Sequence, residues 1–543
     1  MSNTLNGIIE ETTLKYLDDI EDIEKTPKEI EEELLGSMQM ELGMYAQKNG
    51  LKKSSVKIPQ KLDFYIIAEI LARRYPICTI NTAGTNADES YDLLAIYMSE
   101  GKNEGIYVTD ENTFSKLIKE FNYSITSRES DECINRLRLI VERKERTCDK
   151  DLIALNNGIF NYSEKKLLPF SPDYVFLTKS RVNYNENAKC INIHNDLDDT
   201  DWNVEDWMND LSDDPGVVHL LWQILGAIIR PHVSWNKSRW FYSEKGNNGK
   251  GTLCELMRQI CGDGAYASIP LSDMGKDFML EPLTRASAII VDENDVGTFI
   301  DKAANLKAIV TNDVIQINRK FKTPIPYKFY GFMVQCLNEM PRVRDKSDSF
   351  FRRQIFIPFN KCFTGKERRY IKTDYLRRPE VLEYVLYKVL HMEYYTFDVP
   401  PSCEQALNDY KEFNDPVRVF IDEVVNECSW DLIPFTFLYD LYKKWFKLNM
   451  PSGTIQNKST FINDLIGALG DNEIWYATRK TQYRTNKFTF KCEPLIAKYE
   501  LTEWENSKYK NKKTATMEDR CTINPDSMTD RQRGIVRRSV YEN

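Results

Sequence analysis

The segment FYSEKGNNGKGTLCEL, residues 241–256, constrains the fold of this chain more than any other. A strand-like apolar run leads into a turn rich in glycine and asparagine, and a helical pattern follows Lys250. A strand, a glycine-rich loop and a helix in this order let backbone N–H groups and one lysine surround phosphate groups. On this segment alone a second interpretation stays open, in which the glycines merely turn the chain between a strand and a helix.

The loop departs from the strict phosphate-loop pattern at two positions. Glu244 stands where a glycine is usual, and Gly251 stands where Ser or Thr normally follows the lysine. Gly246 can form the tight turn instead, but the missing hydroxyl matters more because it ordinarily contacts Mg²⁺. Thr252, one residue further around the helix, is the candidate replacement. The candidate nucleotide-binding residues are Gly246, Asn247, Asn248, Gly249, Lys250, Gly251 and Thr252.

Polar residues follow two apolar strand patterns downstream. Asp292 and Glu293 come directly after residues 288–291, and such a pair can place one carboxylate near a metal and the other near the attacking water. Thr252 and Asp292 are therefore the candidate metal ligands. Asn338 ends the next apolar run and can orient water against a terminal phosphate, or can simply form a turn.

An arginine pair, Arg352 and Arg353, precedes a further strand pattern, QIFIPF. An arginine in such a place can stabilise transition-state charge in the site of a neighbouring subunit. Ordinary surface charge is the alternative interpretation.

Four motifs, in this order, resemble those of superfamily 3 helicases, and the phage and plasmid primase-helicase branch (poxvirus type) matches best. They are GNNGKGT (246–252), IIVDE (289–293), CLNEMP (336–341) and FRRQIFIPF (351–359). More broadly, the chain is similar to the Rep initiator helicases of staphylococcal pathogenicity islands and related phages. The resemblance implies a P-loop AAA+ motor that uses ATP and Mg²⁺, forms a hexameric ring and unwinds DNA in the 3′-to-5′ direction.

The resemblance also implies roles for individual residues. Lys250 and its loop would bind ATP, Asp292 and Glu293 would form the Walker B element, and Asn338 would be sensor 1. Either Arg352 or Arg353 would be the arginine finger, and the motif does not decide between them.

A β-hairpin is predicted between the acidic pair and Asn338, in TNDVIQINRKFKTPIPYKFYG. In the family that this chain resembles, such a hairpin enters the central channel. Lysines at its tip would pair with phosphates, and a phenylalanine would contact a base or sugar. An ordinary exposed hairpin is the alternative. The candidate DNA-binding residues here are Arg319, Lys320, Phe321 and Lys322.

The C-terminal region has the order of a winged helix, with three helical patterns followed by the strand-like YATRKTQYRTNKFTF and room there for β-hairpins. Basic residues on one helix and in the expected wing suit duplex DNA. A lid or a protein-interaction module with ordinary surface lysines is the alternative. The candidates are Lys443, Lys444, Lys447, Arg479, Lys480 and Arg484.

Composition narrows the class of protein. The net charge of −9 argues against wrapping of nucleic acid by the whole surface, and residues 10–33 carry much of the acidic excess, as a solvated helix, a tail or an acidic arm. The 12 cysteines include no CxxC pair, which disfavours a zinc site or a disulfide framework. The N-terminal part also lacks the acidic pair and histidine of a primase. Without a signal peptide or a long apolar run, we expect a cytoplasmic protein that makes no membrane contact.

We therefore expect an α/β multidomain protein. Its parts are an acidic segment (1–34), an α+β accessory domain (35–148), a linker or collar (149–214), the motor (215–400), a winged-helix-like domain (401–505) and a polar, basic tail (506–543). The expected function is an ATP-dependent replicative DNA helicase and replication initiator of a phage or mobile element. It would act on single-stranded and forked DNA and on a duplex origin. The alternative is a nucleotide-switched origin-binding protein without productive unwinding.

Overall fold

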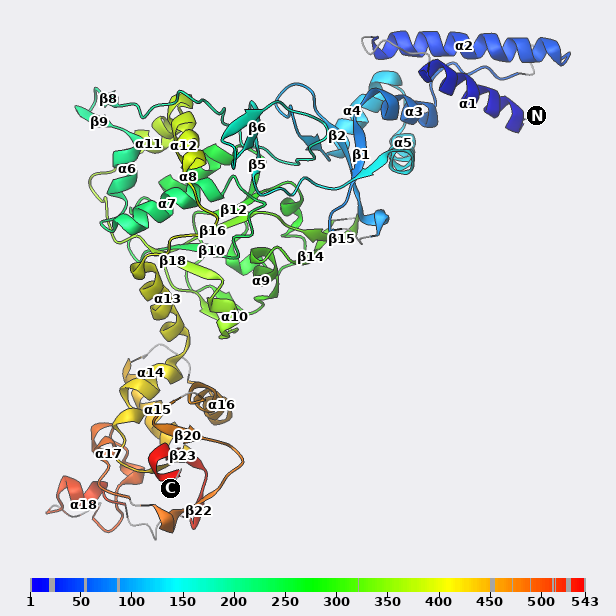
Figure 1. Ribbon diagram of the computed structural model, residues 1–543. Coiled ribbons are helices and arrows are strands. Elements are labelled where there is room, and N and C mark those ends of the chain that lie inside the picture. The colour runs from blue at the N-terminus through cyan, green and yellow to red at the C-terminus, as the bar shows by residue number, and fades with distance from the viewer. Residues whose placement is uncertain are drawn as a thin grey trace. The chain divides into compact units, whose positions relative to one another are not determined.

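The computed structural model describes residues 2–18, 25–52, 56–84, 88–320, 322–449, 455–470, 472–488, 490–509, 512, 514–523 and 529–541. The chain divides into two compact units, Met1–Leu407 and Asn408–Asn543. Both mix helices and sheets, as Figure 1 shows, which confirms the expected α/β multidomain class.

The first unit begins with helices whose boundaries the sequence encodes. Thr26 and Glu29 form a capping box at the start of α2, and Pro27 occupies its first turn. Leu34, Met38 and Leu42 of α2 lie one turn apart and are fully buried. The acidic segment at the N-terminus is thus part of packed helices, with its carboxylates mostly on the exposed faces. The helices here are α1 (Ser2–Asp18), α2 (Pro27–Lys48) and α3 (Phe64–Arg74).

A four-stranded sheet in the order β3-β2-β1-β4 follows these helices. Its β1 strand pairs antiparallel with β2 and parallel with β4, and α4 and α5 carry the chain from the edge strand β3 to β4 at the opposite edge. The elements are β1 (Ile77–Ile80), β2 (Leu93–Tyr97), β3 (Tyr107–Val108), α4 (Glu111–Phe121), α5 (Ser127–Ile140) and β4 (Glu142–Lys144).

Small sheets and two helices lead from this domain to the central sheet. They are the meander β5 (Leu152–Leu155), β6 (Gly158–Asn161) and β7 (Lys166–Leu168), the hairpin β8 (Ile193–Asn195) and β9 (Thr200–Trp202), and then α6 (Val204–Asp210) and α7 (Pro215–Ala227).

The central sheet has five parallel strands in the order β11-β12-β16-β10-β18. Its strands are almost wholly buried, as expected for parallel strands covered by helices, and α7, α8 and α12 lie beside them (Figure 1). The elements are β10 (Ser238–Tyr242), α8 (Lys250–Cys261), β11 (Tyr266–Ala267), β12 (Ala288–Val291), β16 (Phe332–Leu337), β18 (Gln354–Pro358), α11 (Arg369–Thr373), α12 (Pro379–His391) and α13 (Pro401–Asn414), in which the division between the units falls.

Strand register brings three loops to one edge of this sheet. Tyr242 lies opposite Leu337, and Val291 lies opposite Gln335, so the chain leaves β10, β12 and β16 at nearly the same level. In open parallel sheets, ligands bind outside these carboxyl ends. The sheet therefore gathers the glycine-rich loop, the acidic pair and Asn338 at one edge.

Short elements connect β12 to β18. The predicted hairpin is present as β14 (Val314–Arg319) and β15 (Lys322–Lys328), which pair antiparallel with a register shift next to Arg319. The others are β13 (Phe299–Ile300), α9 (Ala304–Val310), β17 (Arg342–Val343) and α10 (Asp348–Phe351).

The second unit has its own core of buried aromatic and aliphatic side chains, among them Trp430, Trp445 and Trp475. Its three-stranded sheet has the order β19-β23-β20, with the central strand supplied by the C-terminal segment. Described residues of the segment 506–543, which was expected as a tail, therefore contribute to the fold of this unit.

Within the described residues of 476–490, the expected hairpins are not formed. Instead, β20 pairs with β23 and β21 with β22. The elements of this unit are α14 (Pro416–Glu423), β19 (Leu432–Pro434), α15 (Phe435–Asn449), α16 (Lys458–Ala468), β20 (Trp475–Ala477), β21 (Tyr483–Arg484), α17 (Pro494–Lys498), α18 (Met517–Cys521), β22 (Arg531–Gln532), β23 (Gly534–Arg537) and α19 (Arg538–Tyr541).

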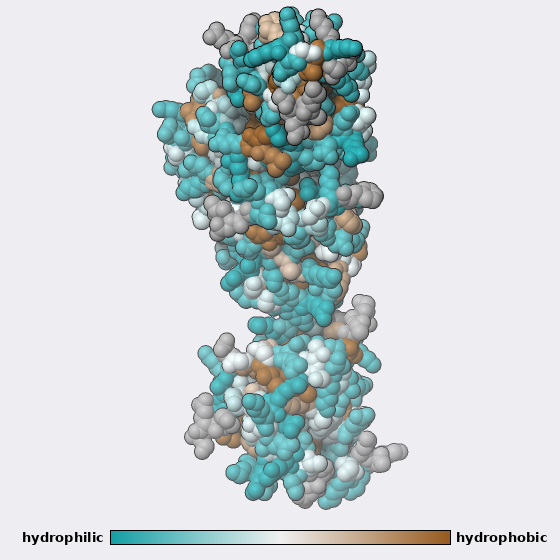
Figure 2. Space-filling model, turned by 90° about the vertical axis from the view of Figure 1, so that its right-hand side faces the viewer, coloured by the Kyte–Doolittle hydropathy of each residue, from teal (hydrophilic) through white to brown (hydrophobic). Residues whose placement is uncertain are grey.

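The described helices include none that is long and apolar enough to span a bilayer. In the view of Figure 2 the surface is mostly hydrophilic, with scattered apolar residues rather than one broad apolar face.

Candidate functional site

The glycine-rich loop joins β10 to α8 in a conformation that depends on its small residues. Gly249 caps α8 at φ 88°, a conformation that strongly favours glycine, and a Cβ placed on it would lie 2.5 Å from Leu211 Cδ2, which would have to shift. Asn247 also has a positive φ, 52°. The Asn248 amide donates to the Lys245 carbonyl, while its Oδ1 accepts from the Lys250 N–H at 3.3 Å. The loop is therefore preformed around the start of the helix.

The Lys250 ammonium points back across the carboxyl edge of the sheet. It donates to the Leu337 carbonyl at 2.9 Å, to Asn338 Oδ1 at 2.9 Å and to the Ser243 carbonyl at 3.3 Å. Lys250 is 5% exposed, and burial lowers the pKa of its ammonium. The structure thus brings two of the predicted site residues, Lys250 and Asn338, into direct contact.

The acidic pair at the end of β12 is divided between two environments. Asp292 forms an ion pair with Arg258 of α8, at 2.9 Å between Oδ1 and Nη2. Burial raises the pKa of the Asp292 carboxyl, but the hydrogen bond and charge of Arg258 outweigh this effect, and the pKa lies below its usual value. Glu293 is exposed, and no partner for its carboxylate is found among the described residues. Of the two carboxylates, Glu293 is therefore the one that makes no side-chain contact with the described part of the chain.

Two buried amides, which the sequence did not indicate, fix the loop that carries the acidic pair. The Asn294 amide donates to Gln335 Oε1 and to the Cys336 carbonyl, both at 3.0 Å, and its Oδ1 accepts from the Leu271 N–H. Gln335 in turn donates to the Ile269 carbonyl at 3.1 Å. These contacts tie the segment after β12 to β16 and to the β11 side of the sheet.

The predicted metal ligands do not make a conventional Mg²⁺ site. Gly251 has no side chain, and the Asp292 carboxylate is already bonded by a guanidinium. Thr252 lines the neighbouring cavity and makes no side-chain hydrogen bond to the described part of the chain. Nor does any group of three or more His, Cys, Asp or Glu side chains suited to a metal occur in the described residues. The pairing of Thr252 with Asp292 as metal ligands therefore lacks support in this geometry.

A cavity of about 750 Å³ opens beside the glycine-rich loop. This volume lies within the range of about 300–1,000 Å³ that is usual for ligand sites. Asn247, Gly249 and Thr252 line one side, and aromatic and basic residues line the rest. These include Trp207, Phe363, Lys361, Lys366, Arg368, Arg369 and Lys372.

The arginine pair lies at the opposite edge of the same sheet. Arg353 directly precedes β18, and its carbonyl accepts from the Ser238 N–H at the start of β10. Since β10 has five residues, the pair lies about 16 Å from the carboxyl edge, at about 3.3 Å a residue. The two side chains differ: Arg353 donates to Ser349 Oγ at 2.8 Å, whereas Arg352 is exposed and its guanidinium has no hydrogen-bond partner among the described residues. Neither arginine reaches Lys250 of its own chain.

The candidate DNA-binding hairpin contacts the N-terminal domain of its own unit. Lys322 pairs with Glu111 of α4 at 2.8 Å, and the guanidinium of Arg319 donates to the Thr323 carbonyl at 2.9 Å. Lys320 is exposed at the tip, while Phe321 lies outside the described residues.

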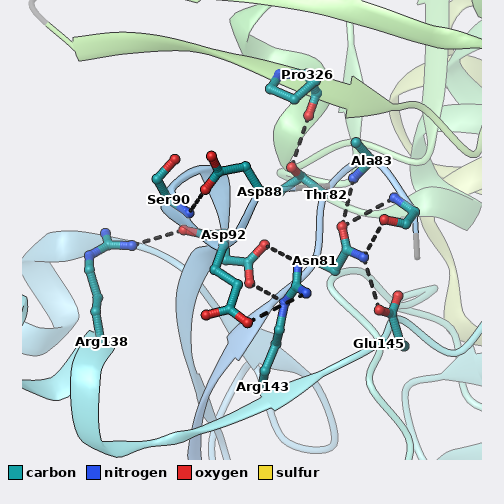
Figure 3. A network of polar contacts seen from close by, with 12 residues as sticks. Asn81, Thr82, Ala83, Asp88, Ser90, Asp92, Arg138, Arg143, Glu145 and Pro326 are labelled. Atoms are coloured by element: carbon teal, nitrogen blue, oxygen red, sulfur yellow. Dashed lines mark hydrogen bonds and ion pairs between the residues drawn. The ribbon is translucent and has the colours of Figure 1, made fainter. Parts of the chain in front are cut away.

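Two residues next to β1 and β4 hold the base of the hairpin. Figure 3 shows the Thr82 hydroxyl donating to the Pro326 carbonyl of β15, at 2.8 Å. Arg146, just after β4, donates to the Lys328 carbonyl at 2.9 Å and stacks over Tyr327. The hairpin and the four-stranded sheet are thus joined through main-chain carbonyls, which the sequence gives no means to predict.

The remaining candidates belong to the second unit. Lys444 and Lys447 of α15, with Lys480 and Arg484, are exposed. Lys443 pairs with Asp440 at 2.9 Å, and Arg479 donates to the Ser459 carbonyl at 2.6 Å. Four of the six candidate side chains are therefore open to a ligand, and two are engaged within the unit.

Family models match three parts of the chain. A D5 N terminal like model matches residues 11–202, and a poxvirus D5 protein-like model matches residues 412–522. Between them, residues 241–353 match a family of unknown function, DUF5906, and this span holds the glycine-rich loop, the acidic pair and Asn338.

The matches to the two D5 models support membership of the phage and poxvirus D5-type family of primase-helicases. Membership of this D5-type family supports a role in DNA replication. No curated protein is significantly similar to the chain in sequence.

Among solved structures, the apo C-terminal region of NrS-1 is similar, with a TM-score of 0.41 and 13% identity over 78% of this chain and 98% of that one. Its A form gives a TM-score of 0.39 and 12% identity over 74% and 86%.

Proposed function

We propose that this D5-type protein is an ATP-dependent DNA helicase of replication, built around a P-loop AAA+ motor of superfamily 3. The observation that carries the proposal is the convergence of Lys250, Asn338 and the acidic pair at the carboxyl edge of one parallel sheet. The strand order supports it, because the strand before the phosphate loop lies between the one that ends at Asn338 and the one that follows the arginine pair.

The proposed chemistry uses the chain's own residues. ATP, carrying its Mg²⁺, is the substrate. The N–H groups from Gly249 to Thr252 and the Lys250 ammonium hold the phosphates. The lysine exchanges its bonds to strand-end carbonyls for bonds to phosphate oxygens, which releases the Asn338 amide to orient a water molecule. Glu293 accepts the proton of that water.

Hydrolysis is proposed to be shared between subunits of a hexameric ring. Because Arg352 and Arg353 lie at the far edge of their own sheet, they can serve only the site of another copy. Arg352 is the better candidate for the arginine finger, because its guanidinium is exposed while that of Arg353 is bonded to Ser349. The exposure of its guanidinium thus supports Arg352 over Arg353, between which the sequence motif does not decide.

DNA is proposed to contact the β14–β15 hairpin and the second unit. Lys320 and Lys322 would pair with the phosphates of a single strand in the channel. The second unit is proposed to be winged-helix-like, with Lys444, Lys447, Lys480 and Arg484 reading a duplex origin. Lys443 and Arg479, which are engaged within the unit, contribute less.

Strand displacement from a forked DNA tests the proposal. Wild-type protein with ATP should separate the strands, and Glu293→Gln should bind ATP but unwind on the order of 10²- to 10⁴-fold more slowly, the usual loss on removing a general base. Asp295→Asn, an exposed change in the same loop, is the matched control. Unwinding by Glu293→Gln at the wild-type rate would remove Glu293 from the mechanism.

A second function, a nucleotide-switched origin-binding protein, is favoured by one observation. Asp292 is bonded to Arg258 and residue 251 is glycine, so two groups that usually support hydrolysis are missing or occupied. ATP-dependent binding to DNA by wild-type protein, with no strand separation and no phosphate release, would support the switch over the helicase.

A further inference from the structure

The side chain that lies over Gly251 is a lysine from a distant segment. A Cβ built on Gly251 would lie 3.8 Å from Lys372 Nζ. Lys372 belongs to α11, which contacts α8, and the buried Ile371 next to it joins the same core as the motor sheet. The position of the ammonium over the glycine-rich loop is therefore set by packing.

The positive charge of Lys372 next to Gly251 is not neutralised by any residue that the structure describes. Its ammonium forms no hydrogen bond or ion pair with any residue that the structure describes, although the side chain is half-buried. It lines the same cavity as Gly249 and Thr252, and its charge helps to lower the pKa of Asp292. A half-buried cation without a partner among the described residues, beside a helix N-terminus, would be stabilised by a bound anion.

We propose that Lys372 is a second phosphate-binding residue of the nucleotide site, which grips the triphosphate from the side opposite Lys250. The inference rests on the proposed nucleotide site and deepens it. A Cβ at residue 251 would make only an ordinary van der Waals contact with this ammonium, so the lysine places a positive charge beside the position where Ser or Thr usually contacts Mg²⁺. Part of the positive charge that Mg²⁺ normally brings to the phosphates is then supplied by the protein.

This arrangement predicts nucleotide binding that survives removal of Mg²⁺. Isothermal titration of the full chain with ATP, in Mg²⁺ and in EDTA, measures the ratio of the two affinities. Lys372→Met should weaken ATP binding on the order of 10- to 100-fold, as expected for loss of a hydrogen bond to a charged group, and should raise the Mg²⁺-to-EDTA ratio. Lys372→Arg should restore most of the affinity. Lys166→Met, an exposed lysine of β7, is the matched control and should change neither quantity.

Binding of adenosine, which carries no phosphate, distinguishes a phosphate contact by Lys372 from a purely structural role of this lysine. If Lys372 touches phosphate, Lys372→Met should bind adenosine as the wild type does. An equal loss for ATP and adenosine, or an unchanged Mg²⁺-to-EDTA ratio, would mean that the lysine only shapes the cavity and would overturn the proposal.

Failure of the proposed function would give a different experimental result from failure of the proposed role of Lys372. Wild-type protein that binds no ATP, as Lys250→Met is expected to behave, would remove the nucleotide site and the role of Lys372 with it. Wild-type binding with an unaffected Lys372→Met would remove the role of Lys372 alone.

Discussion

Lys250 Nζ lies 2.9 Å from Asn338 Oδ1, so the lysine of the glycine-rich loop is bonded to the amide that ends the neighbouring strand. Lys250 is the first residue of α8 and Asn338 directly follows β16, and the register of β10 with β16 sets the distance between them. When a phosphate takes the lysine, the amide loses its donor. Occupancy of the site and the orientation of Asn338 are therefore linked.

Asn338→Ala tests this link. The lysine keeps its two carbonyl acceptors, so ATP binding should stay within a few-fold of wild type, while hydrolysis should fall on the order of 10²- to 10³-fold, as when one oriented polar group is removed from a reaction site. Phosphate release at saturating ATP measures the effect, and Glu339→Gln, the exposed neighbour, is the control. Loss of ATP binding itself would show that Asn338 holds Lys250 in place and has no role in the reaction.

Arg352→Ala and Arg353→Ala should fail in different ways. Without Arg352, ATP binding should persist while hydrolysis by the assembled protein falls on the order of 10³- to 10⁵-fold. Without Arg353, the bond to Ser349 is lost and the melting temperature should fall. Mixing Arg352→Ala with Lys250→Met should restore part of the activity, because each supplies the group that the other lacks. No recovery in mixed assemblies would place the reaction within one subunit.

Lys322→Ala should weaken binding to single-stranded DNA and reduce its salt dependence. Each phosphate contact on a single strand contributes about 0.7 to the slope of log K against log salt, so the slope should fall by about that amount. Basal ATP hydrolysis should persist. Lys119→Ala, an exposed lysine of α4, is the control for charge. Since Lys322 is paired with Glu111, Glu111→Gln should strengthen DNA binding. An unchanged slope in Lys322→Ala would exclude a phosphate contact at this residue.

Local features of the fold follow from local sequence. Apolar runs ending in polar residues place Asp292 and Asn338 at strand ends, and the structure has β12 over 288–291 and β16 over 332–337. The pattern Thr26 to Glu29 also encodes the start of α2, because a capping box needs only four consecutive residues. Such signals could have identified the acidic segment as packed helix.

Partners that come from distant segments could not be predicted. The sequence near Asp292 does not indicate its contact with Arg258, and the sequence near Gly251 does not indicate its contact with Lys372. Helical periodicity predicts which face of a helix a side chain lies on, but it does not predict which distant residue packs against that face. The same holds for β23, which pairs with strands about 60 and 100 residues earlier in the chain. Basic residues around 531–538 suggested a tail, although Ile535 and Val536 are fully buried.

The pH dependence of ATP binding should reveal Lys250. In the free protein, burial lowers the pKa of this ammonium, and bound phosphates would raise it again. Between these two pKa values, binding takes up a proton, so the affinity should fall by up to tenfold for each pH unit above the pKa of the free protein and should be flat below it.

Titration calorimetry above about pH 8, where phosphate groups with a second pKa near 6 are fully ionised, measures both affinity and proton uptake. Lys250→Arg is the matched control, because a guanidinium stays charged throughout this range. The affinity of Lys250→Arg for ATP should be independent of pH, whether or not it is weaker than that of the wild type. If the wild type and Lys250→Arg share one pH profile, another group takes up the proton on binding. The charge of Lys250 then does not change when ATP binds.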